Sequence, residues 1–228
     1  MKNRKKFIVA IDQGTTSSRA ILFNTSGVPI FKSQLEFKQY FPNNGWVEHN
    51  PEEIWKTTKK VLLKAINKSK KLKAIILTIG ITNQRETTIM WDSVTGKPVY
   101  NAIVWQDRRT ADFCNKFKSK KRERIISRKT GLLIDPYFSG TKIKWIIDNV
   151  LKAKKLLKKK QLLFGTVDTF LLWRLTKGLV HATDATNASR TMLYNITTNS
   201  WDNQILKSLK IPTHILPIIK DSSDNFGA

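Results

Sequence analysis

Three short segments with apolar residues, separated by polar turns, open the chain. The second turn is Asn24-Thr25-Ser26-Gly27, a set of residues that favours tight turns. Runs of this length bounded by turn residues are typical of strands. The pattern therefore predicts strands over residues 7–12, 20–24 and 29–35, paired as a meander.

A helix and a further strand are expected next. Asn50 as the capping residue, Pro51 at the first helical position and the acidic pair after it form a strong helix start. Apolar or small residues then recur every three or four positions as far as Ile66. Residues 73–81 are an almost continuous apolar run, which predicts a strand buried on both faces. These elements together predict an α/β domain with a mixed sheet flanked by helices.

The rest of the chain alternates helical and extended patterns. We predict helices up to about residue 129, followed by a Pro-fixed loop that carries Tyr137. A capped helix then continues into the lysine run at residues 152–160. A strand over residues 162–167, a helix to residue 175 and a hydroxyl-rich loop over residues 180–190 complete the pattern.

The net charge of +24 adds a second possible function class. A strongly basic chain can bind nucleic acid or an acidic membrane surface. The lysines, however, are spread along the chain and outnumber the arginines that usually read bases and phosphates. No zinc spacing or nucleic-acid-binding motif accompanies them, so we expect no specific nucleic-acid partner. The lysine run is expected to be a solvated helix face first and a polyanion site only second.

The cellular compartment follows from other features. Cys114 is the single cysteine, so no internal disulfide can form, as suits a reducing compartment. We find no signal peptide and no apolar run long enough for a transmembrane helix. We therefore expect a cytoplasmic protein without a transmembrane segment.

Asp12 is the first candidate for chemistry, because it stands where a buried strand stops. A carboxylate there can hold a hydrated magnesium ion. Gly14 and the hydroxyl residues after it offer N–H and O–H donors to phosphate oxygens. The alternative is a hairpin whose turn is merely polar.

Arg85 and Glu86 are the second candidates, since they follow the strand predicted over residues 73–81. In α/β sheets ligands bind outside the carboxyl ends of the strands. An adjacent Arg and Glu present donors and acceptors side by side, which suits a small polyol. Trp105 could lay an apolar face against the carbon skeleton. The alternatives are a salt-bridged loop pair and a core Trp.

Taken together, these motifs resemble a known family over essentially the whole chain. Residues 12–17 resemble the first phosphate motif of the actin-like ATPase (ribonuclease H-like) fold, and residues 137–149 resemble the signature of the FGGY family of carbohydrate kinases. Residues 83–87, 105–110 and 165–169 resemble the glycerol-kinase branch in particular.

This resemblance implies transfer of the γ-phosphoryl group of ATP to the 3-hydroxyl of glycerol. It implies that the nucleotide phosphates are lined by Thr15, Thr16, Ser17 and Arg19, and that Asp12 holds Mg²⁺ through water. It also implies that Arg85, Glu86 and Tyr137 hydrogen-bond the glycerol hydroxyls while Trp105 packs on its carbons.

Kinases of this family have two lobes, and residues 1–228 correspond to the N-terminal, glycerol-binding one. The second lobe carries the aspartate base and a paired-glycine phosphate loop, and this chain has no Gly-Gly pair. We therefore expect the C-terminal nucleotide-binding domain to be absent, so that no catalytic base is assigned. Little activity is expected unless a separate chain supplies that lobe. A non-catalytic basic binding module and an inactive remnant stay open as alternatives.

Overall fold

The computed structural model describes residues 4–227, which divide into two compact units. The described residues up to Gln39, together with Asn50–Gln84, form the first unit. Tyr40–His49, together with the described residues from Arg85 onward, form the second. The short strand β4 (Gln39–Tyr40) lies at the border between them in the sequence.

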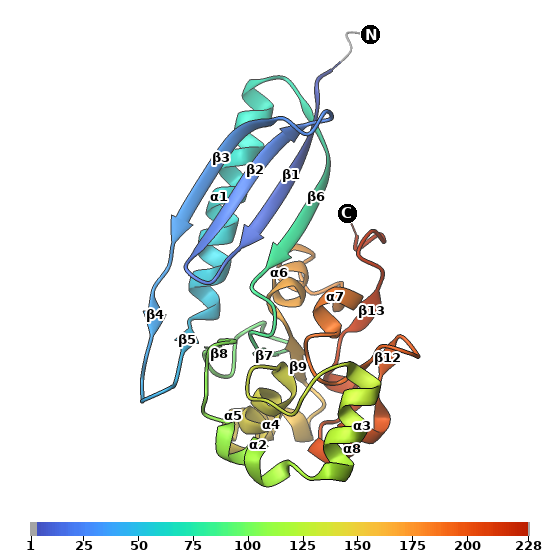
Figure 1. The fold of residues 1–228 in the computed structure, drawn as a ribbon. Coiled ribbons are helices and arrows are strands. Elements are labelled where there is room, and N and C mark those ends of the chain that lie inside the picture. The colour runs from blue at the N-terminus through green and yellow to red at the C-terminus, as the bar shows by residue number, and fades with distance from the viewer. Residues whose placement is uncertain (1–3, 228) are drawn as a thin grey trace. The chain divides into compact units, whose positions relative to one another are not determined.

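The first unit is a four-stranded mixed sheet with one long helix along a face (Figure 1). Its elements are β1 (Lys6–Gln13), β2 (Ser17–Asn24), β3 (Pro29–Glu36), α1 (Pro51–Lys71) and β6 (Ile75–Asn83). The strand order is β3-β2-β1-β6; β1 to β3 form the predicted antiparallel meander, and β6 runs parallel to β1. The expected helix start is confirmed, since the Asn50 side chain accepts a hydrogen bond from the Glu52 amide at 2.9 Å.

Strand β6 corrects one expectation. Its apolar run was expected to be buried on both faces, but Leu77 is 51% exposed and Ile79 is 40% exposed. The reason is its place in the sheet, because within the described part of the chain β6 is an edge strand whose one partner is β1. Helix α1 packs mainly against β2 and β3 and covers little of β6. An apolar run indicates that a strand is able to be buried on both faces. The strands and helices packed beside it decide which of its side chains are buried.

The second unit consists of short strands and helices around one apolar core. Its elements are β5 (Glu48–His49), β7 (Ile89–Asp92), β8 (Ala102–Ile103), α2 (Ala111–Phe117), α3 (Lys120–Thr130), α4 (Ser139–Asn149), α5 (Leu151–Lys158), β9 (Leu162–Gly165), α6 (Val167–Leu175), β10 (Ala182–Asp184), α7 (Ala185–Ala188), β11 (Tyr194–Asn195), β12 (Ser200–Trp201), α8 (Asn203–Leu209), a 3₁₀ turn (Thr213–Ile215) and β13 (Ile218–Lys220). β5 pairs with β8 and β7 with β9, both antiparallel. In this part of the chain, as in the first unit, no described helix is long and apolar enough to cross a membrane.

Two local expectations in this unit were wrong. The helix expected to continue into the lysine run is broken at Val150, whose backbone is extended (φ −102°, ψ 109°), so α4 and α5 are separate helices. The loop expected over residues 180–190 contains β10 and the short helix α7. Here the Asp184 side chain caps α7 through the Asn187 amide at 2.8 Å, and β10 gains a parallel partner in β13. The partner strand β13 is not visible in the local pattern, whereas the cap is a local contact over three residues.

The end of β9 allows a test of core packing. A Cβ atom on Gly165 would lie 2.6 Å from Thr169 Cβ and 2.9 Å from a ring carbon of Trp91, both fully buried side chains. We expect Gly165→Ala to lower the free energy of unfolding by about 1–3 kcal/mol, because a packed core cannot make room for the methyl group. Urea unfolding followed by circular dichroism measures the change. Gly80→Ala is the control, since nothing lies within 4 Å of its Cβ position; an equal loss in both variants would contradict the prediction.

Candidate functional site

The first group of candidate residues lies at the turn between β1 and β2. The Gly14 amide donates to the Ser17 carbonyl at 2.9 Å and closes the turn that carries Thr15 and Thr16. The buried side-chain amides of Gln13 and Gln84 contact this turn. Gln84 Nε2 donates to the Gln13 side chain at 3.1 Å and to the Gly14 carbonyl at 3.2 Å. The turn therefore has a fixed backbone, as a phosphate-binding loop requires.

Asp12 and Arg19 face each other across this hairpin. They are directly opposite in the β1–β2 register, and Arg19 Nε donates to Asp12 Oδ2 at 3.1 Å, with a second, shorter contact from Nη2. Both side chains are about one-third exposed, at 36% for Arg19 and 34% for Asp12. A carboxylate and a guanidinium thus lie at the same end of strands β1 and β2. The carboxylate is suited to a cation and the guanidinium to an anion.

The donor set around Asp12 fits a metal ion that arrives with a ligand. Among the described residues no group of three or more His, Cys, Asp or Glu side chains could hold a metal. Magnesium does not need such a cage, because it keeps several waters and is usually held by one or two carboxylates plus substrate phosphates. A single carboxylate beside a hydroxyl-rich turn matches that kind of binding.

The second group of candidate residues centres on Glu86, in the second unit. Glu86 is a non-glycine residue in the left-handed region (φ 65°), and the Thr87 amide donates to the Arg85 carbonyl at 2.8 Å across it. Three-residue turns with positive φ are rare and strained, and such residues cluster at functional sites. Arg85 is exposed, whereas Glu86 is only 3% exposed.

Contacts from distant segments hold Glu86 in this conformation. Its carbonyl accepts from the buried Ser139 hydroxyl at 3.0 Å, and its carboxylate Oε1 accepts from Arg190 Nε at 2.6 Å. The guanidinium of Arg190 also lies 5.7 Å from the ring centre of Tyr137. The expected alternative, an ion pair between Arg85 and Glu86, is therefore replaced by a pair between Glu86 and a residue 104 positions along the chain.

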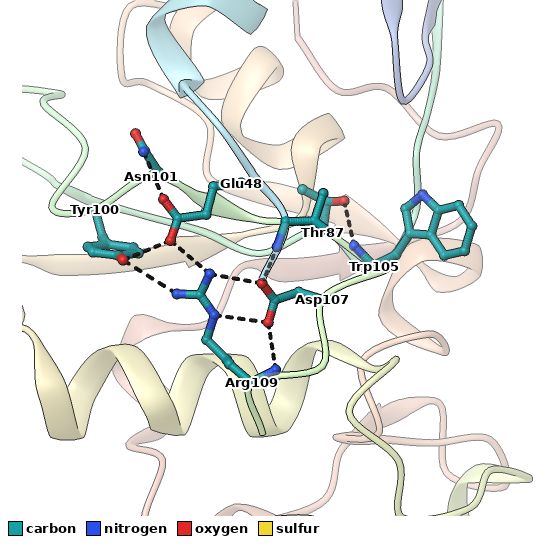
Figure 2. A network of polar contacts seen from close by, with 8 residues as sticks. Glu48, Thr87, Tyr100, Asn101, Trp105, Asp107 and Arg109 are labelled. Carbon is teal, nitrogen blue, oxygen red and sulfur yellow. Dashed lines mark hydrogen bonds and ion pairs between the residues drawn. The ribbon is translucent and has the colours of Figure 1, made fainter. Parts of the chain in front are cut away.

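Two aromatic rings stand beside Glu86. Trp105 and Tyr137 are in edge-to-face contact with ring centres 5.6 Å apart. The Trp105 amide donates to the Thr87 hydroxyl at 3.3 Å, next to Glu86 in the sequence, and the Trp105 ring points away from the polar network behind it (Figure 2). Tyr137 follows a turn in which its amide donates to Asp135 Oδ1 at 2.8 Å. Three of the four residues expected to bind a polyol are thus connected, since Arg190 contacts both Glu86 and Tyr137 and Trp105 bonds to Thr87 beside Glu86, and the exposed Arg85 adjoins Glu86 in the chain.

A buried lysine lies under this group. The Lys142 side chain, on the first turn of α4, is fully buried, and its Nζ donates to the Tyr137 carbonyl at 2.5 Å. Burial lowers the pKa of Lys142 to about 7, although the charges of Asp107, Glu86 and Asp135 oppose that shift. Lys142 therefore fixes the Tyr137 backbone through this buried hydrogen bond. The expected side-chain cap of α4 is absent, because Ser139 bonds to Glu86 and Phe138 is the N-cap residue.

Comparison with known proteins decides the family. The model of the FGGY family of carbohydrate kinases, N-terminal domain, matches residues 7–228. This chain belongs to the FGGY family. The solved structures that it resembles are carbohydrate kinases of the actin-like ATPase fold, so the expected fold is confirmed.

Individual relatives of this FGGY chain are glycerol kinases. The chain is 55% identical over 222 residues to the glycerol kinase of Ectopseudomonas mendocina, covering 97% of this chain and 45% of that protein. It is 55% identical over 227 residues to the glycerol kinase of Malacoplasma penetrans, covering 100% and 45%. The crystal structure of Plasmodium falciparum glycerol kinase with ADP superimposes with a TM-score of 0.93 at 37% identity, covering 98% and 45%. The chain thus spans less than half the length of these relatives.

Arg190, Ser139 and Lys142 lie near Glu86 and were not among the predicted site residues. Lys142 lies within the FGGY signature, so its position was noted without a role. Arg190 sits at the end of the segment expected to be a loop, and nothing in the local pattern links it to Glu86. A polar residue 104 positions away becomes a neighbour only through the packing of α4, α7 and the Glu86 turn.

Proposed function

We propose that this chain is the glycerol-binding half of an ATP-dependent glycerol kinase, which transfers a phosphoryl group to the 3-hydroxyl of glycerol. The carrying observation is the Glu86 turn, a strained and buried acceptor beside the Trp105–Tyr137 pair. The identity of about 55% to glycerol kinases supports this choice among the family's substrates.

The residues of the second unit bind and orient glycerol in this proposal. Glu86 Oε1 is engaged by Arg190, so we assign Oε2 to a glycerol hydroxyl. The exposed Arg85 donates to a neighbouring hydroxyl, and the Tyr137 hydroxyl contacts a third. Trp105 covers the carbon chain, since each carbon carries hydrogen atoms that an aromatic face accommodates. Phosphoryl transfer requires little covalent work from a protein, so positioning of this kind supplies much of the acceleration.

The residues of the first unit bind the nucleotide phosphates in the same proposal. Thr15, Thr16 and Ser17 offer amides and hydroxyls, and Arg19 offers a guanidinium. Asp12 would hold Mg²⁺ through water, and the ion would neutralise part of the phosphate charge. The bond from the γ-phosphorus to the bridging oxygen breaks, the glycerol 3-oxygen bonds to phosphorus, and ADP leaves. The hydroxyl proton passes to a base outside this chain, in the second lobe that the proposal requires, and no residue of this chain is assigned to accept it.

Calorimetric titration of the purified chain with glycerol tests the proposal. We expect measurable binding that falls about 10- to 100-fold in Glu86→Gln, because a hydrogen bond to a charged group contributes about 1.5–3 kcal/mol. Glu36→Gln is the matched control, since Glu36 is an exposed residue at the end of β3. Equal affinity in all three proteins, or no heat with folded wild-type chain, would contradict the proposal.

The alternative of a basic binding module is not favoured. Lysines of α5 such as Lys152, Lys154 and Lys155 are exposed, as a solvated helix face requires. The family match extends over nearly the whole chain and includes this helix. A salt-dependent shift with arbitrary duplex DNA, without glycerol binding, would reverse this preference.

A further inference from the structure

A buried ion cluster lies behind the turn that carries Trp105. We call it the Arg109 cluster; its members are Glu48, Tyr100, Asn101, Asp107 and Arg109 (Figure 2). The Arg109 side chain is 0% exposed and donates to both Asp107 oxygens at 2.9 and 2.8 Å and to Glu48 Oε1 at 2.7 Å. Tyr100 and Asn101 donate to the two Glu48 oxygens at 2.7 and 2.9 Å.

Aromatic rings fix the plane of the guanidinium. Its central carbon lies 3.8 Å from the ring centre of Trp46 and 4.6 Å from that of Trp145. Burial opposes the charge, but the hydrogen bonds to Asp107 and Glu48 outweigh it and raise the pKa of Arg109. A planar, permanently charged fork held in this way defines one geometry for the carboxylates that it joins.

The Arg109 cluster is connected to Trp105 through the backbone. The Asp107 amide donates to the Val104 carbonyl at 3.0 Å and closes a turn in which Trp105 is the second residue. Both ends of this turn are bonded to Val47: the Val104 amide donates to the Val47 carbonyl at 3.0 Å, and the Val47 amide donates to Asp107 Oδ2 at 2.6 Å. Arg109 bonds to the same Asp107 oxygen at 2.8 Å. The ion cluster therefore determines where the turn stands.

Figure 2 shows Trp105 and Arg109 on opposite sides of the turn. The Trp105 side chain leaves the turn on the side away from Arg109, and its ring meets Tyr137. Stability alone does not require two carboxylates and a guanidinium here, because a buried ion cluster is often no more stabilising than apolar side chains of similar volume. The contribution of the Arg109 cluster is instead to hold the turn at residues 104–107 in a single position.

We infer that Arg109 is a positioning residue, which fixes the Trp105 turn and so the apolar wall of the glycerol site. This inference rests on the proposed function, in which Trp105 covers the glycerol carbons. Arg109 itself is fully buried behind the turn, and its guanidinium bonds to the carboxylates of Asp107 and Glu48.

Fluorine NMR of the chain labelled with 5-fluorotryptophan tests the inference. The Trp105 resonance is assigned by its loss in Trp105→Phe. We expect one narrow Trp105 line in the wild type and a broadened or split line in Arg109→Lys, which keeps the charge but not the fork. Glycerol affinity, measured by calorimetry, is expected to fall at least about tenfold, since a displacement of about 1 Å can cost 10²-fold. Asp107→Asn is the second variant in case Arg109→Lys does not fold.

Tyr194→Phe is the matched control, because it removes one side-chain hydrogen bond, to Asn199, at a buried tyrosine of the same unit that lies outside the Arg109 cluster. It is expected to keep the narrow line and wild-type affinity. A narrow Trp105 line and unchanged affinity in folded Arg109→Lys or Asp107→Asn would overturn the inference. If the wild type binds no glycerol while the line still broadens only in the fork variants, the positioning role stands and the proposed function fails.

Discussion

The 228-residue chain is expected to release ADP from ATP and glycerol at least about 100-fold more slowly by itself than after a second lobe is supplied. Loss of a positioned base typically costs about 10²–10⁴-fold, and loss of cleft closure adds to that. The chain spans 45% of the length of the Malacoplasma penetrans glycerol kinase, and the buried carboxylate at the proposed glycerol site, Glu86, is already paired with Arg190. A coupled assay for ADP measures the difference.

Fusion of this chain to the unmatched part of that relative supplies the second lobe in a defined ratio. The control is the same fusion with Glu86→Ala, which keeps the lobe but removes the proposed contact to glycerol. We expect turnover in the first fusion and little in the second. Equal turnover by the isolated chain would contradict the half-enzyme proposal and would mean that a base lies within these residues.

Lys142 is expected to make the stability of the chain depend on pH above neutrality. Burial lowers its pKa to about 7 from 10.5, so between these values the folded protein has lost a proton that the unfolded chain still binds. The free energy of unfolding therefore rises with pH in this window, by at most about 1.4 kcal/mol per pH unit. Urea unfolding at pH 7, 7.5, 8 and 8.5 measures the slope.

Lys142→Met removes the titrating group while keeping a side chain of similar length, so the slope is expected to flatten in that variant. Lys144→Met is the control, because Lys144 lies on the same helix but pairs with Asp148 at the surface. The window ends at pH 8.5 because the buried Cys114 thiol, whose pKa burial raises, would oppose the rise at higher pH. Parallel slopes in the wild type and Lys142→Met would contradict the assignment.

The elements of the first unit could be predicted because their signals are local. The meander of β1, β2 and β3 follows from apolar runs and turn residues, and α1 begins at Pro51 because Asn50 caps it. Such contacts join residues a few positions apart, so a sequence pattern contains both partners. The burial of β6 could not be predicted in the same way, since it depends on which strands and helices lie beside it.

The sequence identifies the candidate residues as motifs. It does not predict how those of the second unit are arranged in space. Trp105, Tyr137 and Glu86 each stand in a recognisable segment, and the structure brings their segments together. Arg190 and Arg109 acquire their roles only there. Arg190 reaches Glu86 across 104 residues, and Arg109 reaches Glu48 across 61.

The sequence by itself determined the family, the α/β class and the kinds of side chain available for phosphate, cation and polyol. These follow from local periodicity and from motifs that are read position by position. Only the tertiary structure decided that Glu86 pairs with Arg190 rather than Arg85, that Lys142 is buried beneath Tyr137, and that Arg109 fixes the Trp105 turn. The physical reason is that buried charges must find partners wherever packing places them, and packing joins segments that no sequence spacing relates.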